Sequence, residues 1–294
     1  MTLGDCTHPH GEKSTLGGVR VLEGKVAVVT GGASGIGKAL ATRFRDAGMH
    51  VVIADVEAGA LQATAEELGV LGVRTDVSHA ASVQALADEV RERFGTAHVL
   101  CNNAGVGGGG LIADQTLADW EWVLGVNLWG VIYGLHSFLP MLLANSDGGH
   151  VVNTASVAGL VAGAGIGPYN ASKSAVVAIS ETLRKELDMA EAGVGVSVLC
   201  PGYVRTNIFE SQRNRPEALR NPSRAAGDAR VRNDALKRML DTAMDPAEVA
   251  ELVHDAVVED RFWVITHAEF LKPIAERADE IVAGTNPRPG RFGE

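Results

Sequence analysis

Short runs of apolar and β-branched residues alternate with longer segments of helical character from Lys25 onward. Such alternation is typical of a parallel sheet that helices cover on both faces. The apolar runs predict seven strands, at residues 26–30, 50–54, 72–75, 98–101, 150–154, 194–199 and 262–265. A helical segment is expected in every gap between strands except the last. The pattern therefore predicts an α/β fold, doubly wound around a seven-stranded parallel sheet.

Glycines mark helix ends in this pattern. The helix that follows the first strand is expected to end at Gly48, and another helix near Gly95, because glycine readily adopts the left-handed conformation beyond a helix end. Together with a length of 294 residues, which allows one large core, this predicts a single domain over residues 24–284. Residues 1–23 are expected to be a loose N-terminal extension and residues 285–294 an extended tail.

Residues 207–243 do not fit the alternation of strands and helices. The segment is polar and broken by two prolines, and it contains six arginines: Arg213, Arg215, Arg220, Arg224, Arg230 and Arg232. It is either a solvated surface excursion or a lid over a substrate site. Its place, just beyond the sixth strand, favours the lid.

Composition limits the classes of partner. The formal net charge of −10 disfavours nucleic acid and anionic lipid, and no apolar run approaches the roughly 20 residues of a membrane span. The first 23 residues lack the continuous apolar run of a secretory signal. Three cysteines (Cys6, Cys101 and Cys200) without metal-type spacing are expected to be reduced thiols, and no metal site is predicted. A soluble, cytoplasmic protein is therefore expected.

A glycine cluster follows the first strand and leads into a helix. Gly31 allows a sharp exit from the strand, Gly35 lets backbone amides approach a pyrophosphate, and Gly37 allows the helix to pack closely on the sheet. The N-terminus of the helix adds free N–H groups and a positive dipole. A plain tight turn is the alternative. The predicted contacts in this Rossmann-type turn are Gly31, Ser34, Gly35, Ile36 and Gly37.

Asp55 ends the second strand, eighteen residues beyond Gly37. A carboxylate at this place accepts hydrogen bonds from the adenosine ribose and repels a 2′-phosphate. No Arg or Lys stands at Val56 or among residues 31–34 to reverse that preference. The residues thus favour NAD over NADP, with an aspartate that merely begins a turn as the alternative.

Tyr169 and Lys173 stand four residues apart in a helical segment, so both project from one face. A free tyrosine has a pKa of about 10, and a neighbouring ammonium is expected to lower it enough for proton exchange with an alcohol. Ser156 follows the fifth strand, where its hydroxyl can bond a substrate oxygen. Taken alone, the Tyr–Lys spacing arises by chance on many helices, and Ser156 is more typical of a cap or turn residue.

Four motifs together resemble those of the compact, single-domain short-chain dehydrogenases/reductases. The glycine turn matches TGxxxGxG, residues 102–105 match NNAG, Tyr169 and Lys173 match YxxxK, and Pro201-Gly202 follows the sixth strand. The similarity covers the chain from Gly24 to about Ile265. It implies that Tyr169 is the proton donor or acceptor, that Lys173 also holds the nicotinamide ribose, and that Ser156 positions the substrate.

The resemblance also implies roles for residues that carry no signal by themselves. Asn127 matches the asparagine that links the lysine to solvent through water, with a helix start as the alternative. Asp76 and Thr206 are otherwise a turn former and a helix cap. The cofactor contacts implied by position are Asp76, Val77, Asn103, Gly105, Pro201, Gly202, Val204 and Thr206.

The function predicted from these residues is hydride transfer between NAD(H) and a secondary alcohol or ketone. Small side chains dominate residues 158–167, which suggests room for a bulky apolar substrate such as a steroid, terpenoid or alicyclic ring; a tight loop is the alternative. Walls are expected from residues 106–111 and 157–166 and from Tyr203, Ile208 and Phe209. A non-catalytic dinucleotide-binding regulator and a lyase or epimerase remain alternatives, and the resemblance implies a homo-oligomer, dimeric or tetrameric.

Overall fold

The computed structural model describes residues 19–221 and 243–287, and they contain the predicted sheet. Seven parallel strands lie in the order β3-β2-β1-β4-β5-β6-β7. Each predicted strand is confirmed to within one residue at either end. The strands are β1 (Val26–Thr30), β2 (His50–Asp55), β3 (Leu71–Arg74), β4 (Val99–Asn102), β5 (Gly149–Thr154), β6 (Val194–Cys200) and β7 (Trp263–Ile265).

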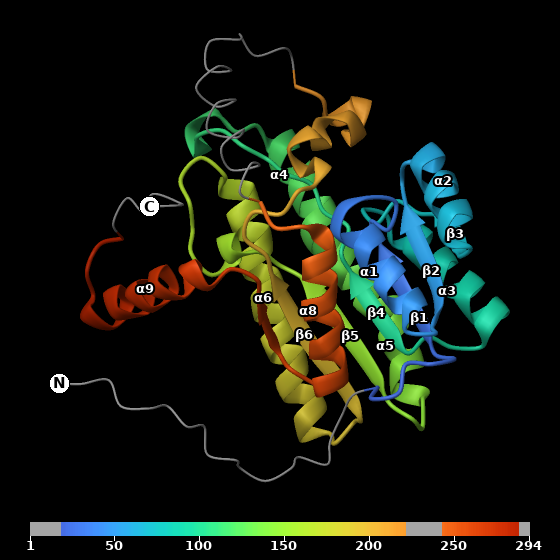
Figure 1. The fold of residues 1–294 in the computed structure, drawn as a ribbon. Coiled ribbons are helices and arrows are strands. Elements are labelled where there is room, and N and C mark those ends of the chain that lie inside the picture. Colours follow the sequence, from blue (N-terminus) through green and yellow to red (C-terminus); the bar gives the residue numbers. More distant parts are fainter. Residues whose placement is uncertain (1–18, 222–242, 288–294) are drawn as a thin grey trace.

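Helices cover both faces of the sheet, as Figure 1 shows. The first cluster of core residues joins α1, α2 and α8 to one face, and the second joins α3, α5 and α6 to the other. The helices are α1 (Gly35–Asp46), α2 (Ala58–Leu68), α3 (Ala80–Phe94), α4 (Leu117–Leu124), α5 (Gly130–Ala144), α6 (Gly167–Met189), α8 (Pro246–Glu259) and α9 (Leu271–Ala283). The helix ends expected near Gly48 and Gly95 are confirmed.

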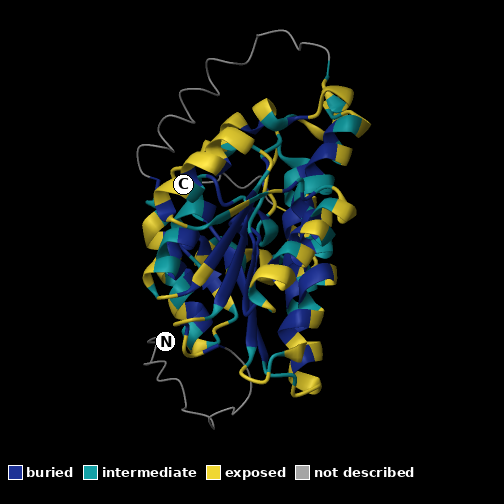
Figure 2. Cartoon of the chain, turned by 90° about the vertical axis from the view of Figure 1, so that its right-hand side faces the viewer, coloured by how far each residue is buried: buried dark blue, intermediate teal, exposed yellow. Residues whose placement is uncertain are grey.

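Strand β1 shows why the strands read as continuous apolar runs. Ala27 and Val29 pack toward α1 and α8, whereas Val26 and Val28 pack toward α3 and α5. Successive side chains point to opposite faces, and both faces are covered. The strands are accordingly dark blue and the outer helix faces yellow in Figure 2.

Helix α8 corrects the prediction that the last gap contains no helix. It lies between β6 and β7 and buries Val249, Val253 and Val257 against the sheet. The sequence does contain its signal, because Asp245 and Glu248 form a capping box around a proline at the first turn. The polar insertion before it hides this signal.

A second correction concerns the helix expected to start around Asn127. The helix begins ten residues earlier, at Leu117, and continues through a π-helical turn, η2 (Gly125–Trp129), into α5. In that turn the Gly130 N–H bonds to the Gly125 carbonyl. Asn127 is therefore inside the helix and fully buried, and the alternative that it starts a helix is wrong.

The helical segment Leu117–Ala144 is long and apolar enough to cross a membrane by length and composition alone. Of its most apolar window, 44% is buried inside the protein, where Phe138 and Leu142 pack on the sheet. The packing of a core helix accounts for this apolar character.

The chain ends and the insertion are described only in part. Val19 and Leu22, placed by the sequence in a loose extension, are buried in the core beside α1, whereas residues 1–18 lie outside the described part. Residues 285–287 are exposed without secondary structure, and the rest of the expected tail is not described. The described insertion contains two short 3₁₀ helices, η4 (Asn207–Asn214) and η5 (Glu217–Leu219).

Several predicted features fall on residues 222–242 or 1–18 and so lie outside the described structure. These are Arg224, Arg230, Arg232 and Cys6. The other two cysteines, Cys101 and Cys200, are buried free thiols, as predicted. Burial raises the pKa of both, so neither is ionised near neutral pH.

Candidate active site

A cleft of about 200 Å³ lies at the carboxyl ends of the strands. Its walls come from the loops and strand ends that follow β1 through β6. The chain runs from β1 through β2 to β3 toward one edge of the sheet, then crosses to β4 on the other side of β1 and continues to the opposite edge. Loops therefore separate at this point and leave a crevice, the usual ligand site of a doubly wound sheet.

The glycine turn forms one end of the cleft. Gly31 and Gly35 have φ angles of +65° and +52°, which favour glycine, and a Cβ on Gly37 would lie 2.0 Å from the Gly31 carbonyl oxygen. Helix α1 begins here, and the side chain of its N-cap, Ser34, makes no capping hydrogen bond. The first amides of α1 thus remain free for an anion such as a pyrophosphate.

Asp55 lies at the end of β2 and lines the same cleft. Its two carboxylate oxygens accept hydrogen bonds from the backbone N–H groups of Ala33 (3.1 Å) and Glu57 (3.0 Å). The carboxylate is thereby fixed beside the glycine turn, with lone pairs left over for ribose hydroxyls. The residues in this part of the cleft fit the adenosine half of a dinucleotide.

The predicted contacts after β3 and β4 also line the cleft. Asp76 and Val77 do so, although Asp76 additionally accepts a hydrogen bond from the Ser78 amide and so forms a turn. Asn103 is held by Thr30, whose hydroxyl accepts from the Asn103 amide at 2.9 Å. Sequence reasoning did not single out Thr30, although it opens the TGxxxGxG motif.

Tyr169 and Lys173 reach the cleft from the first turns of α6. The Lys173 Nζ lies 5.7 Å from the centre of the Tyr169 ring and donates to the Thr154 carbonyl at 2.8 Å. A Cβ on Gly105 would lie 3.6 Å from the same nitrogen. The predicted Tyr–Lys pair and the loop after β4 are therefore brought together.

Burial governs the ionisation of both residues. Loss of hydration lowers the pKa of Lys173 from 10.5 to about 8. Burial likewise raises the pKa of Tyr169, and a hydrogen bond with Ser156 only partly offsets it. The pKa of Tyr169 is therefore raised, and not lowered as expected, because desolvation of the phenol is the largest effect.

Ser156 is not among the residues that line the cleft, although its neighbour Ala155 is. It is 7% exposed and follows β5. Its Oγ accepts a hydrogen bond from the Ala158 amide at 3.1 Å. Ser156 therefore acts as a local cap, as the alternative proposed, and also contacts Tyr169.

Asn127 holds the loop after β4 against α6. Its Oδ1 accepts from the Val106 amide at 2.8 Å, and its Nδ2 donates to the Val106 carbonyl at 3.0 Å and to Ser172 Oγ at 3.2 Å. Ser172 in turn donates to the Tyr169 carbonyl at 2.8 Å. Asn127 does not line the cleft itself. Ser172, within the Tyr-x-x-x-Lys motif, was not predicted.

The loop after β6 contributes only part of the predicted set. Pro201 and Thr206 line the cleft, whereas Gly202 and Val204 do not. The Gly202 amide donates to Thr266 Oγ1 at 3.1 Å, and a Cβ on Gly202 would lie 2.8 Å from His267. These contacts anchor the loop to the segment after β7. Thr206 does occupy the N-cap position of η4, as the alternative proposed, but its side chain makes no capping hydrogen bond.

The wall expected for a substrate is formed only in part by the predicted residues, and residues 107–111 do not contribute to it. Val106 and Ile208 line the cleft, and Trp122 and Val126 join them, whereas residues 157–166, Tyr203 and Phe209 do not. The difference arises because α4 and η2 lie behind the loop after β4, which the sequence pattern alone did not place.

Close packing and backbone conformation explain two of the glycines among residues 158–167. A Cβ on Gly159 would lie 2.7 Å from the Lys173 carbonyl oxygen, so this glycine permits close packing on α6. Gly165 has a φ angle of +80°, and its carbonyl accepts from the Gly110 amide at 2.7 Å. At these positions the tight-loop alternative describes the structure.

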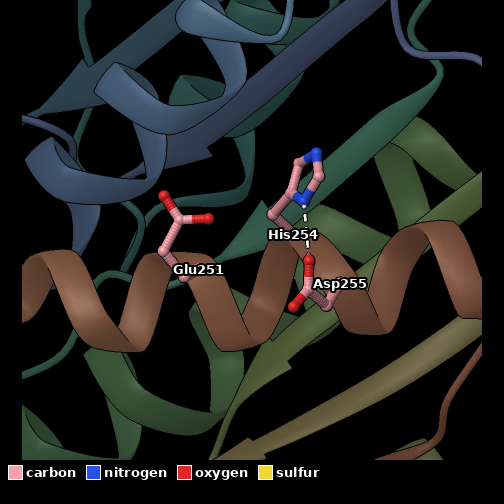
Figure 3. A group of neighbouring side chains, drawn as sticks. All are labelled: Glu251, His254 and Asp255. Atoms are coloured by element: carbon pink, nitrogen blue, oxygen red, sulfur yellow. Dashed lines mark hydrogen bonds and ion pairs between the residues drawn. The ribbon is translucent and has the colours of Figure 1, made fainter.

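Three side chains on α8, drawn in Figure 3, are of types that often bind metal ions, but two of them contact an arginine of α1. Glu251, His254 and Asp255 have ligand atoms within 4.8 Å of one another. Arg43 of α1 donates to Glu251 at 2.7 Å and lies 3.0 Å from His254 Nδ1. The Arg43 guanidinium thus already occupies Glu251 and His254, and these contacts tie α1 to α8.

A switch-point cleft with a glycine cradle, a strand-end carboxylate and a buried Tyr–Lys pair defines a dinucleotide-binding enzyme of the doubly wound class. The family model for short chain dehydrogenases matches residues 25–217. The chain belongs to this family, and is an oxidoreductase of it.

Solved and characterised relatives cover most of the chain. A short chain dehydrogenase/reductase from Burkholderia phymatum, crystallised in complex with NAD, is 44% identical with a TM-score of 0.89, over 92% of this chain and 99% of that chain. The 1-deoxy-11-beta-hydroxypentalenate dehydrogenase of Streptomyces arenae is 36% identical over 87% of each chain. The 3beta-hydroxysteroid dehydrogenase 2 of Eggerthella lenta is 38% identical over 67% of this chain and 77% of its own.

Proposed function

We propose that this protein is an NAD-dependent dehydrogenase that interconverts a secondary alcohol and its ketone. The observation that carries the proposal is that the glycine cradle, Asp55 and the Tyr169–Lys173 pair all line one cleft. One end of this cleft fits an adenosine and a pyrophosphate, and the other offers a proton-exchanging phenol. A non-catalytic regulator would not require the phenol and the ammonium to share the cleft.

The chain's own residues hold the reactants and move one proton. Tyr169 takes the proton from the alcohol or returns it to the ketone oxygen, and Ser156 orients that oxygen through a hydrogen bond. Lys173 holds the nicotinamide ribose, with Asn127 supporting the loop beside it. When bound, NAD supplies the hydride acceptor.

We propose NAD rather than NADP as the working cofactor. The Asp55 carboxylate, fixed by two backbone N–H groups, repels a 2′-phosphate. Arg213 also lines this part of the cleft, but Glu57 already pairs with it at 2.7 Å. The NAD complex of the Burkholderia phymatum relative supports the same preference.

A bulky apolar alcohol is the proposed substrate class. The inner wall offers Val106, Trp122, Val126 and Ile208. The names of two relatives specify a hydroxysteroid and a hydroxypentalenate, which supports an alcohol of this size. We expect cyclic secondary alcohols to be turned over with a higher kcat/KM than small linear ones; equal or better use of the small ones would contradict this substrate class.

Replacement of Tyr169 by Phe tests the proposed chemistry, because it removes one hydroxyl and leaves the glycine cradle unchanged. We expect turnover to fall by at least about 100-fold, the contribution of one positioned acid–base group, with NADH affinity within about twofold of wild type. The assay is a screen of secondary alcohols with NAD and NADP in parallel, followed by absorbance of the reduced cofactor. Full activity in Y169F would contradict the assigned role.

We also propose a homo-oligomer, dimeric or tetrameric, in a reducing cytoplasm. Large apolar side chains remain exposed on the surface of the helical layer, including Trp129 (48%), Leu143 (47%) and Met189 (86%). The free thiols of Cys101 and Cys200 are compatible with a reducing compartment. Neither nucleic acid nor membrane is a proposed partner, in view of the net charge of −10.

A further inference from the structure

A buried arginine lies behind the inner wall of the cleft. Arg215 follows η4, and its side chain is 3% exposed. Its Nη1 donates to Oδ1 of Asp119 on α4 at 2.7 Å, and the guanidinium carbon lies 5.1 Å from the centre of the Trp122 ring. Trp122 lines the cleft, as do Asn214 and Pro216 on either side of the arginine in the chain. Arg215 does not line the cleft itself, so its guanidinium lies one side chain behind the wall.

One edge of the Arg215 guanidinium has no hydrogen-bond partner. Its Nε and Nη2 are both buried, and neither bonds to any residue that the structure describes. These two nitrogens lie side by side on the planar group, where their N–H bonds form the fork that fits the two oxygens of a carboxylate. We name this edge, Nε and Nη2 of Arg215, the free fork. Among the arginines within the described residues, Arg215 is the one with buried donors left unpaired.

Asp119 cannot supply the missing acceptors. Its Oδ1 accepts from Arg215 and from the Asn221 side chain at 2.8 Å. Its Oδ2 accepts from the backbone N–H and the hydroxyl of Thr116, at 2.8 and 2.9 Å. Four hydrogen bonds fill the usual capacity of a carboxylate. The contact between Asp119 and Arg215 therefore anchors the insertion to α4 without any use of the free fork.

The free fork is more than an anchor requires. An anchor needs only Nη1, and a buried N–H without a partner destabilises the folded chain, most of all on a charged group. The fork lies beside the apolar cluster of Val106, Trp122 and Val123, and Val106 and Trp122 line the cleft. A ligand group with two acceptor oxygens would pair both donors at once. The unpaired edge thus points to a ligand that contains such a group.

We propose that the free fork binds a carboxylate of the substrate, which is then a ring alcohol that also carries an acid group. This inference rests on the proposed function and adds one charged group to the apolar substrate class. The apolar wall contacts the ring, and the acid reaches Arg215 when the entering substrate displaces the Trp122 side chain. Because Asp119 already balances the arginine charge, recognition depends on the two hydrogen bonds of the fork.

The first test measures binding without reaction. Cyclohexanecarboxylate and its methyl ester are titrated into the full chain by calorimetry. We expect the acid to bind at least about tenfold more tightly than the ester, because only the acid presents two charged oxygens to the fork. R215K should remove this difference, since an ammonium keeps the charge but lacks the fork. Equal binding of acid and ester by the wild-type chain would overturn the proposal.

The displacement of Trp122 has its own signal. The acid should change the tryptophan fluorescence of the wild-type chain and leave that of W122F unchanged, because the indole loses its contact with the guanidinium. A change of equal size in W122F would contradict this route to the fork.

The second test measures turnover with NAD. Hydroxycyclohexanecarboxylate and a hydroxysteroid carboxylic acid are each compared with their methyl esters. We expect at least one acid to exceed its ester about tenfold in kcat/KM, and R215M to lose this preference while ester turnover stays within about twofold of wild type. The control is R220M, which breaks the exposed 3.0 Å pair of Arg220 and Glu217 in the same insertion. It should keep the wild-type preference.

The outcomes separate the two proposals. If the wild-type chain turns over neither acids nor esters, the proposed function fails, and calorimetry still decides whether the fork binds a carboxylate. If R215K and R215M weaken acid and ester to the same degree, Arg215 is a structural anchor only and the inference is wrong. Melting temperatures close to that of wild type would show that the variants fold. R215K keeps a cation beside Asp119 and provides the comparison if R215M does not fold.

Discussion

Lys173 carries its amine into a nearly dry position, at 2% exposure, with the Thr154 carbonyl as its recorded acceptor. Desolvation lowers its pKa to about 8, so the protein holds a lysine that can lose its proton close to physiological pH. Burial of a charged lysine amine lowers the free energy of unfolding. Groups with strongly shifted pKa values concentrate at functional sites, because the reaction requires the shifted pKa even where it lowers stability.

This burial predicts a pH dependence of stability. The unfolded chain keeps the lysine proton up to the ordinary pKa of 10.5, whereas the folded chain releases it near pH 8. Between these values the unfolded state binds more protons, so the free energy of unfolding should rise with pH because of Lys173. We expect K173M to lack this rise, in urea unfolding compared at pH 7.5 and pH 9.5. A parallel rise in wild type and K173M would contradict the lowered pKa.

The helix from α4 to α5 shows how one element forms the site indirectly. A π-helical turn inserts an extra residue per turn and rotates the side chains that follow, and such turns often occur at functional sites. Here the turn places Asn127 in the interior, where it satisfies both backbone groups of Val106. The loop after β4 thereby gains the position from which Gly105 approaches Lys173.

The contacts of Asn127 predict a large effect on stability. N127A would leave the buried Val106 amide and carbonyl without partners, which should lower the free energy of unfolding by about 3 kcal/mol. S172A removes one hydrogen bond of Asn127 and the bond from Ser172 to the Tyr169 carbonyl, but leaves both Val106 groups paired, and should cost about 1 kcal/mol. Urea unfolding of the two variants provides the comparison. Similar losses in both would indicate that the Val106 bonds contribute little.

At the scale of the whole molecule, two apolar clusters on opposite faces stabilise the sheet, and the cleft lies at the carboxyl edge, where Ala54 and Val77 of the second cluster line it. Function is concentrated in the loops at the carboxyl edge, which are attached to a rigid scaffold. Helix α9 extends away from this body in Figure 1 and buries none of its residues.

Ligand binding should raise the stability of this scaffold by mass action. NADH at about 100 times its dissociation constant should increase the free energy of unfolding by about 2.7 kcal/mol. NADPH at the same concentration should increase it less, because the Asp55 carboxylate repels a 2′-phosphate. Thermal unfolding with each cofactor measures the difference. An equal or larger effect of NADPH would contradict the cofactor preference.

The sequence by itself determined the strands and the glycine, carboxylate, phenol and amine groups of the cleft. All seven strands could be predicted, because a sheet covered on both faces requires uninterrupted apolar runs between turn residues. The glycine turn, Asp55, Tyr169 and Lys173 could be predicted because their geometry is local: a turn, a strand end and one helix face. These features depend on neighbours within a few residues, which the sequence displays directly.

Only the tertiary structure decided which loops meet above the cleft and how strongly the reacting groups are desolvated. Glu57 and Arg213 are separated by 156 residues, and no local pattern pairs them. The raised pKa of Tyr169 and the interior position of Asn127 likewise follow from packing between α4, α6 and the sheet. Contacts of this kind depend on which surfaces are brought together by folding, and a one-dimensional pattern does not contain that information.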